Sequence, residues 1–402
     1  MGRRPILTLV IGWSATRILL LAQLAAFSDA WIGDVRLYAL WSILLREGQF
    51  PVGDPFWQYP PGAGVLFAGL GSLGASPVWA FLVLALLADA AILAMLCGSV
   101  ARGPAAFRSW WGPTAWVVGG LAIGPVMIAR FDLIPTAVAV AAILLLNRPA
   151  ASGAMAGLGA LLKVWPILVL IALPRRRVFA GCASAVAVVL LAVTAIGAWA
   201  PGSTSFLAEQ RSRGLQIESL GALPYLIAGA MGSRPEVVLR FGAFEVQAPW
   251  VNQLGLALTG LGILLIAGLA ALRVLGRLES APGGDIALLA IMISVATSRV
   301  LSPQYAVWLI GIAAAAGCAA RSRGRQATWL LIAMAAVTQV LFPWGYGSYL
   351  EAAGYAVGLQ TVRIGLLLGA IGVIAAATLR PAFAPRATDV SAGPSPGLRH
   401  EP

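Results

Sequence analysis

Charged residues are scarce in this chain of 402 residues: they make up 10% of the sequence, whereas 60% of the residues are hydrophobic. Soluble domains carry about 25% charged residues, so the composition excludes an ordinary soluble protein. Apolar runs of about 16 to 24 residues recur along the chain, and a helix needs about 20 to cross a bilayer. A membrane barrel would show alternating apolar and polar residues instead. We therefore predict an all-α fold, a polytopic transmembrane helical bundle.

Histidine, cysteine and lysine are also scarce. The one histidine is His400, so a histidine-based active site or a histidine-ligated metal is excluded. The three cysteines lie inside apolar runs and show neither a disulfide framework nor metal-ligand spacing. We expect no metal and no cofactor. Lys163 is the one lysine in the chain, and its place within an apolar stretch indicates a specific need for a cation.

The formal net charge of +12 does not indicate nucleic-acid binding, because the arginines collect in short loops between apolar runs. Arginine-rich short loops mark the cytoplasmic side of a membrane protein. Ten full spans are expected, at about residues 6–27, 78–101, 113–129, 132–147, 178–199, 254–275, 284–299, 304–320, 327–343 and 361–379.

The apolar stretch 152–173 does not fit a full span. If it crossed, the arginines at 175–177 and 321–325 would face outward, against the preference of positive charge for the cytoplasm. The stretch also contains Lys163 and Pro166, and broken helices at membrane depth are tolerated where they line a cavity. We predict a re-entrant pair of short helices here.

This arrangement predicts one transmembrane domain, residues 1–380, in the plasma membrane with both termini cytoplasmic. Two large segments, 28–77 and 200–253, would lie outside, the second as surface helices over the mouth of a site. Residues 381–402, rich in Pro, Ser, Gly and Ala, are expected to form a disordered cytoplasmic tail. The charged residues of the second segment would either shape acceptor binding or form a solvated loop: Glu209, Arg211, Arg213 and Glu218.

The first outer segment contains DVRLYALWSILLREGQFPVGDPFWQYPP, residues 34–61, which interrupts the apolar sequence. Its first half predicts a helix lying on the membrane surface, on which Asp34, Tyr38 and Trp41 share a face. A second shallow helix is expected over 62–74. The apolar stripe of the first helix is expected to consist of Leu37, Leu40, Trp41, Leu44 and Leu45.

Ionisable residues at membrane depth are costly and need a reason. Arg17 and Asp89 lie midway along neighbouring predicted spans, so we expect a buried ion pair that fixes their packing. Arg130, Lys163 and Arg299 would place three cations near one outer cavity, a set that suits a phosphate or diphosphate ligand. Each has a simpler alternative: Arg130 beside a helix cap at Asp132, Lys163 reaching a lipid headgroup, and Arg299 in a tight turn.

Four stretches carry a resemblance to a known family: DVRLYALWSILLREGQFP followed by YPP, ARFDLIPTAVA, GLGALLKVWPILVLIAL and SRVLSPQYAVWLIG. In this order the chain resembles the GT-C glycosyltransferases, and in particular the polyprenyl-phosphate-mannose-dependent α-mannosyltransferases of glycosyltransferase family 87 in actinobacteria. The resemblance implies an integral membrane enzyme that transfers a hexose, mannose in these relatives, with inversion. Its partners would be a polyprenyl-phosphate sugar donor, a lipid or glycan acceptor and the membrane, with no nucleic acid.

The resemblance further implies an outward-facing site in which an aspartate of the first outer loop is the general base. The matching position is Asp34, and Asp54, in a turn context, is the competing base. The two could also form an acidic metal pair, but no third ligand is visible. Arg299 stands where many relatives carry lysine. The implied donor-phosphate ligands are Lys163, Arg299 and Arg130, and the implied substrate contacts are Tyr38, Asp54, Tyr59, Asp132, Gln304 and Tyr305.

Two other functions fit a polytopic membrane protein. A transporter or lipid-linked sugar flippase would need charges along a path through both leaflets, and such folds often contain inverted repeats. No repeat is visible here, and the unpaired charges cluster toward the outer side. A lipid-linked glycan polymerase or ligase would use a large outer loop rich in Arg and His, but the 200–253 segment contains no His.

Overall fold

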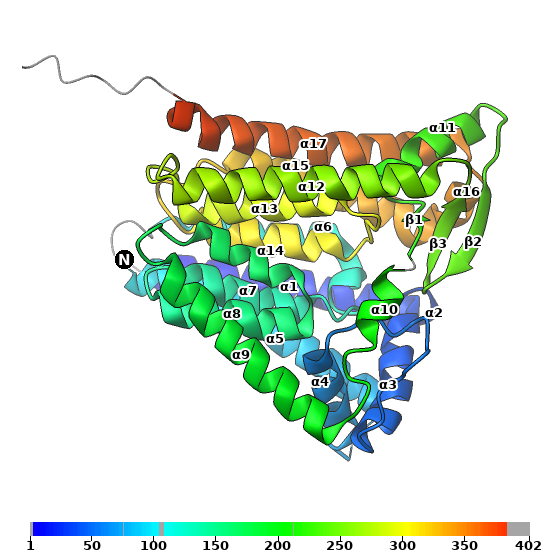
Figure 1. Cartoon of the computed structure of the whole chain (residues 1–402), viewed down its shortest axis with the longest axis horizontal. Coiled ribbons are helices and arrows are strands. Elements are labelled where there is room, and N and C mark those ends of the chain that lie inside the picture. The colour runs from blue at the N-terminus through cyan, green and yellow to red at the C-terminus, as the bar shows by residue number, and fades with distance from the viewer. Residues whose placement is uncertain (1–2, 75, 104–107, 212, 384–402) are drawn as a thin grey trace, which may run out of the picture.

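The computed structural model describes residues 3–383 except 75, 104–107 and 212, and its elements are almost all helices (Figure 1). Six helices are long and apolar enough to cross a membrane, so the chain is a multi-pass membrane protein. They are α1 (Arg3–Ala26), α5 (Pro77–Arg102), α9 (Val178–Trp199), α12 (Val251–Val274), α15 (Arg325–Gln339) with its π-helical extension η5 (Val340–Trp344), and α17 (Gly354–Phe383). Of the tail predicted at residues 381–402, residues 381–383 form the end of α17, and residues 384–402 lie outside the described residues.

Four other predicted spans are shorter helices in the interior. They are α6 (Trp111–Ile123), extended by the 3₁₀ turn η2 (Gly124–Met127), α7 (Leu133–Leu144), α13 (Gly283–Thr297) and α14 (Tyr305–Gly317). These helices have 12 to 15 residues, and a helix that is apolar on every side is expected where every side is covered. The count of about ten spans therefore stays a prediction.

The stretch 152–173 is interrupted, as its sequence predicts. Helix α8 (Pro149–Leu162) ends at Lys163, whose backbone is extended, and the 3₁₀ helix η3 (Trp165–Ala172) follows. The residues that flank this stretch lie close together: Arg177, after η3, donates from Nη1 to the carbonyl of Asn147, before α8, at 3.1 Å. The break places Lys163 within the bundle, and the re-entrant path through a membrane stays a prediction.

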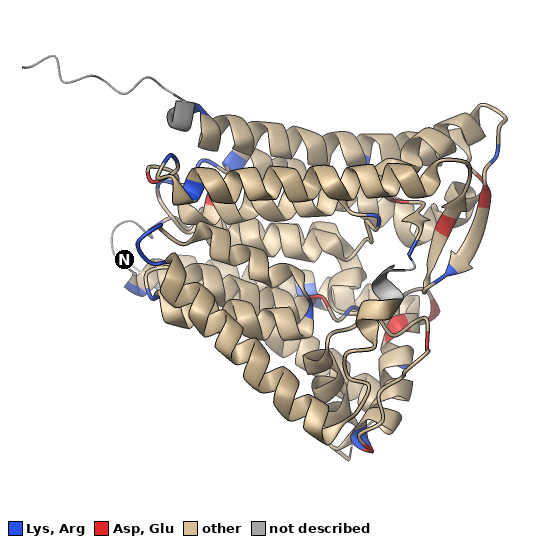
Figure 2. Ribbon diagram, viewed as in Figure 1, with Lys and Arg blue, Asp and Glu red and all other residues tan. Residues whose placement is uncertain are grey.

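The charged residues divide the molecule into two ends (Figure 2). At the end that holds the N-terminus and the end of α17, the charged residues of the connecting loops are mainly arginines. At the other end, where acidic residues also occur, lie α2 (Ser28–Trp31), α3 (Gly33–Arg46) and α4 (Pro61–Gly71). The 200–253 segment lies at this second end as well, so the two segments predicted to be outside occupy one end of the bundle.

The 200–253 segment differs from the predicted set of surface helices. It contains α10 (Phe206–Arg211), the 3₁₀ turn η4 (Leu220–Ala222) and α11 (Leu223–Ala230), but also β1 (Leu215–Gln216), β2 (Glu236–Arg240) and β3 (Ala243–Gln247). The strands form an antiparallel sheet in the order β1-β3-β2. Strands β2 and β3 are joined by Phe241 and Gly242, with φ values of 51° and 71°. Positive φ at both positions is typical of the type I′ hairpin turn.

Helix α3 confirms the predicted helix, but its buried face differs from the predicted stripe. Leu40 is 62% exposed and Leu44 is also exposed, whereas Tyr38, Trp41 and Leu45 are buried. The aromatic rings of the first outer segment explain this orientation, because Tyr38 stacks on Phe67 of α4 with a centroid distance of 4.8 Å. The aromatic contacts therefore set the side of α3 that packs on α4, and Leu40 and Leu44 lie on its uncovered side.

Arg17 and Asp89 form the predicted buried ion pair, at 2.7 Å between Nε and Oδ2. Asp89 also accepts hydrogen bonds from the indole nitrogens of Trp13 and Trp116, each at 2.8 Å.

We expect Arg17→Met to lower the free energy of unfolding by about 3–5 kcal/mol, because it leaves a carboxylate buried without its cation. Thermal unfolding in detergent micelles measures this. Arg17→Met/Asp89→Leu is the control and should recover much of the loss; equal unfolding temperatures for Arg17→Met and wild type would contradict the prediction.

Candidate active site

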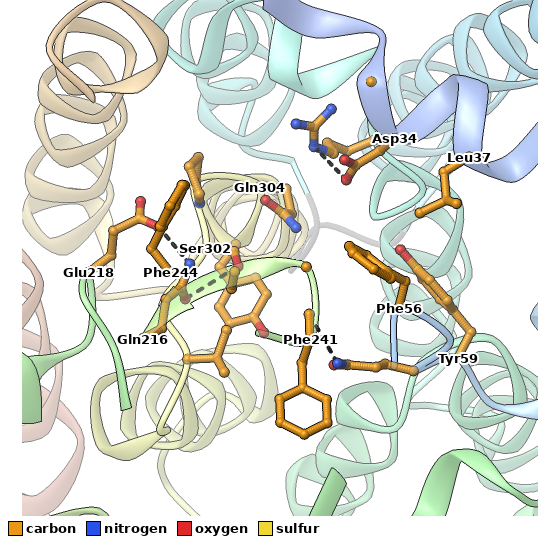
Figure 3. Close-up of a pocket in the computed structure, with 18 of the residues that line it drawn as sticks. Asp34, Leu37, Phe56, Tyr59, Gln216, Glu218, Phe241, Phe244, Ser302 and Gln304 are labelled. Carbon is orange, nitrogen blue, oxygen red and sulfur yellow. Dashed lines mark hydrogen bonds and ion pairs between the residues drawn. The ribbon is translucent and has the colours of Figure 1, made fainter. Parts of the chain in front are cut away.

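A cavity of about 520 Å³ lies where the 28–77 and 200–253 segments meet the bundle. Side chains from α3, the loop before α4, the β2–β3 turn and the 298–305 turn contribute to its wall (Figure 3). The sequence-predicted residues that line it are Asp34, Tyr38, Tyr59, Arg130, Lys163, Gln304 and Tyr305. One cavity thus brings together residues that are up to 271 positions apart in the sequence, from 34 to 305.

Asp34 occupies the first turn of α3 and is held by an arginine. Its Oδ2 lies 3.0 Å from Nε of Arg130, and its side chain is 42% exposed, whereas that of Arg130 is 10% exposed. Arg130 Nη1 also donates to the carbonyls of Trp31 and Ala129, at 2.8 and 3.0 Å. Arg130 is thereby fixed in place and orients a carboxylate that remains accessible from the cavity.

Lys163 is fixed by a buried carboxylate. Its Nζ lies 2.5 Å from Oδ1 of Asp132, which also accepts a hydrogen bond from Nε1 of Trp308 at 2.6 Å. The ammonium group lies over the rings of Trp308 and Tyr305, at 4.9 and 5.5 Å from their centroids. The side chain is 20% exposed and lines the cavity. An ammonium has three N–H donors, so Lys163 can bind Asp132 and a ligand together; this pairing contradicts the headgroup-reaching alternative.

Two phenols form a polar part of the wall. The hydroxyls of Tyr38 and Tyr59 lie 3.1 Å apart. Burial raises the pKa of both phenols above the ordinary value, so both are neutral at physiological pH. Neutral phenols act as hydrogen-bond donors and acceptors, which suits the recognition of hydroxyl groups.

Asp54 is engaged in its own loop and is not among the residues that line the cavity. Its Oδ1 accepts from the backbone N–H of Phe56 and its Oδ2 from Nε1 of Trp41, both at 2.9 Å. The first bond is an Asx turn. Within the described part of the chain, no group of three or more His, Cys, Asp or Glu side chains is placed to hold a metal ion.

Arg299 is not among the residues that line the cavity, whereas Arg213 is. Nη1 of Arg299 donates to the backbone carbonyl of Arg213 at 2.5 Å, and it is the side chain of Arg213 that lines the cavity. The neighbouring predicted residues Gln304 and Tyr305 do line it. Of the three cations predicted to converge, Arg130 and Lys163 meet in the cavity and Arg299 supports its edge.

Glu218, one of the charged residues for which the sequence left acceptor binding and a solvated loop open, lines the cavity. Its side chain is 1% exposed, so the solvated-loop interpretation of this residue is wrong. It accepts from Nε2 of Gln216 at 2.6 Å, from Nη1 of Arg363 at 3.2 Å and from the hydroxyl of Tyr346 at 3.4 Å. Figure 3 shows it across the cavity from Asp34. The sequence feature that could have predicted its burial is its position between the apolar residues Ile217 and Leu220, which is unusual for a solvated acid.

Burial raises the pKa of Glu218 from 4.5 to about 7. The folded protein therefore binds this proton more tightly than the unfolded chain, so the stability it contributes is fully present below about pH 4.5 and is lost as the pH rises through 7. A difference of this size corresponds to about 3 kcal/mol of unfolding free energy.

Wild type should accordingly lose about 3 kcal/mol more stability than Glu218→Gln between pH 4.5 and 8, because the variant has no proton to release at this position. Thermal or denaturant unfolding of both proteins at matched pH values measures the difference. Every other titrating group is common to the two proteins, so parallel pH profiles would contradict the prediction.

The family model of glycosyltransferase family 87 matches residues 57–303, which is more than half of the chain. The match includes Arg130, Lys163 and Arg213 and begins after Asp34. No curated protein and no solved structure matched. The chain therefore belongs to glycosyltransferase family 87, and it is a membrane glycosyltransferase.

Proposed function

We propose that the protein transfers a hexose, most simply mannose, from a polyprenyl-phosphate sugar to a lipid or glycan acceptor at the outer face of the plasma membrane. The observation that carries the proposal is the meeting of one accessible carboxylate, Asp34, with the fixed cation Lys163 in a single cavity. Sugar transfer from a lipid phosphate needs both a base for the acceptor hydroxyl and a cation for the leaving phosphate.

Asp34 is the general base in this proposal. It takes the proton from the acceptor hydroxyl as that oxygen attacks the anomeric carbon of the donor sugar. The bond between the anomeric carbon and the phosphate oxygen breaks, and its electron pair leaves with the phosphate. Attack and departure occur on opposite faces of the sugar, so the anomeric configuration inverts. Arg130 holds the carboxylate in place, since it is buried and anchored by two backbone carbonyls.

Lys163 is the principal ligand of the donor phosphate, and it stabilises the negative charge that grows on the leaving oxygen. Asp132 fixes its position without entering the cavity. Arg130 adds positive charge at the same wall, and Arg299 contributes by supporting the backbone at Arg213. The polar and aromatic groups of Tyr38, Tyr59, Gln304 and Tyr305 surround the sugar.

The outer-face location is supported by the distribution of charge. Arginine-rich loops favour the cytoplasm, and α3 and the β2–β3 turn, which contribute residues to the cavity wall, lie at the opposite end of the bundle from them (Figures 1 and 2). A donor carried on a membrane lipid can reach such a cavity from the bilayer. Both termini lie at the arginine-rich end in this arrangement, consistent with cytoplasmic termini.

Transfer of labelled mannose in membrane vesicles tests the proposal. Vesicles containing the protein should convert polyprenyl-phosphate mannose to a labelled lipid or glycan product and release polyprenyl phosphate. Vesicles without the protein are the background, and a nucleotide-linked mannose should give no product beyond it once endogenous synthesis of the lipid donor is blocked. Movement of the intact donor between leaflets without its consumption would favour a flippase and reject the proposal.

A further inference from the structure

Three cations line the cavity, and two of them are already paired with carboxylates. Arg130 is paired with Asp34 and Lys163 with Asp132. The third cation is Arg213, and none of the ion pairs found in the described part of the chain includes it. We propose, resting on the proposed function, that Arg213 binds the phosphate of the prenyl-phosphate donor and of the leaving prenyl phosphate, and that Arg299 positions Arg213.

The contacts of Arg213 leave room for such a ligand. Its Nη2 donates to the carbonyl of Phe241 at 3.0 Å, and its Nε is buried without a hydrogen-bond partner. A guanidinium has five N–H donors in a planar fork, which matches two phosphate oxygens at once. A buried donor without a partner is costly, and a phosphate that enters the cavity would supply acceptors.

The β2–β3 turn determines where this guanidinium lies. Phe241 adopts a left-handed backbone conformation with φ of 51°, an uncommon state for a bulky residue and one that is often retained at functional sites. Its carbonyl accepts from both Arg213 Nη2 and Gln58 Nε2, at 3.0 and 3.1 Å. The turn therefore links the first outer segment to Arg213 at the edge of the cavity.

In this proposal Arg299 contacts Arg213 and does not contact the phosphate. Its side chain donates to the Arg213 carbonyl, and its own carbonyl accepts from the backbone N–H of Gln216 at 3.0 Å. Two bonds to the 213–216 backbone fix the start of β1, and the Arg299 side chain is absent from the cavity wall. This geometry makes Arg299 a positioning residue.

The charge balance of the cavity supports the assignment. The pairs Arg130–Asp34 and Lys163–Asp132 are each neutral, and Glu218 is paired with Arg363. Burial lowers the pKa of Arg213, and the negative charge of the Glu245 carboxylate, with which Arg213 forms no ion pair, opposes that shift. A phosphodiester carries one negative charge and a departing phosphate monoester up to two, so the unpaired Arg213 favours the leaving group over the donor.

Binding of farnesyl phosphate to the purified protein in detergent micelles tests the inference, with farnesol as the uncharged probe. Thermal stabilisation as a function of probe concentration gives the apparent affinity. We expect farnesyl phosphate to stabilise wild type more than farnesol does. Arg213→Gln should weaken farnesyl phosphate binding at least about tenfold, because a hydrogen bond between two charged groups is lost, and Arg299→Gln should weaken it less.

Arg240→Gln is the matched control, since Arg240 is the exposed arginine next to the same turn and is not among the residues that line the cavity. It should bind farnesyl phosphate like wild type. Arg213→Lys keeps the charge and should bind better than Arg213→Gln, which separates loss of charge from failure to fold. Wild-type affinity in Arg213→Gln, or a larger loss in Arg299→Gln than in Arg213→Gln, would overturn the inference.

Sugar transfer is measured separately in vesicles, so the two proposals can fail independently. Arg213-dependent binding of farnesyl phosphate supports the phosphate site even in a preparation that transfers no sugar. Transfer at wild-type rate and unchanged inhibition by farnesyl phosphate in Arg213→Gln would reject the phosphate site while leaving the proposed function intact.

Discussion

Asp34→Asn should lower sugar transfer in membrane vesicles by at least about a hundredfold, because it removes the proposed general base and leaves an amide that cannot accept the proton. Arg130 would still be fixed by the carbonyls of Trp31 and Ala129, so the wall of the cavity should persist. The loss should therefore appear in the maximal rate, with little change in the donor concentration that gives half-maximal rate. Initial rates with labelled polyprenyl-phosphate mannose at matched protein levels provide the measurement.

Two acids of the same segment serve as comparisons. Asp29 forms an exposed ion pair with Arg36, and Asp29→Asn should transfer sugar like wild type. Asp54→Asn should retain most of its activity, because Asp54 caps a turn and is bonded to Trp41. If Asp54→Asn loses activity and Asp34→Asn retains it, the base is Asp54 and the assignment made here is wrong.

Lys163→Met should reduce both activity and stability. Transfer should fall by about 10²–10³-fold, the usual effect of removing one group that stabilises transition-state charge. The free energy of unfolding should fall by about 3–5 kcal/mol, because Asp132 is left fully buried without its cation. Transfer assays and unfolding in detergent micelles measure the two effects.

The double variant Lys163→Met/Asp132→Asn separates these effects. Removing the buried negative charge should restore much of the lost stability, since the amide oxygen introduced in place of the carboxylate would still accept the hydrogen bond from Trp308. Transfer should remain low, because no cation has been returned to the cavity. Recovery of transfer together with stability would show that Lys163 has a structural role and no contact with phosphate.

Local signals were sufficient to predict several parts of the fold. The long helices follow from the length of their apolar runs, and the interruption at Lys163 follows from a lysine and Pro166 within one run. The short helices α13 and α14 resemble spans in sequence because they are apolar all round, and sequence composition does not record what surrounds them. The β2–β3 hairpin escaped prediction because its two-residue turn is Phe-Gly, whereas this turn type prefers Asn-Gly or Asp-Gly.

The candidate site likewise contains some residues that the sequence predicted and others that it did not. Asp34, Lys163, Gln304 and Tyr305 lie in recognisable stretches, and all four line the cavity. The sequence could not predict that Arg213 lines the cavity in place of Arg299, because the arrangement of the two arginines depends on a hydrogen bond between residues 86 positions apart. A sequence pattern identifies the segment that reaches a site more readily than the side chain that faces it.

The carboxylate of Asp132 has a consequence for the biosynthesis of the enzyme. One of its oxygens contacts both Lys163, 31 residues later, and Trp308, 176 residues later. During translation the lysine can meet its partner early, but the indole that completes the arrangement is made only after most of the chain has been inserted. A nascent chain therefore contains Asp34 and Lys163 long before Trp308 is present, so the hydrogen-bond arrangement that fixes Lys163 is completed late in synthesis.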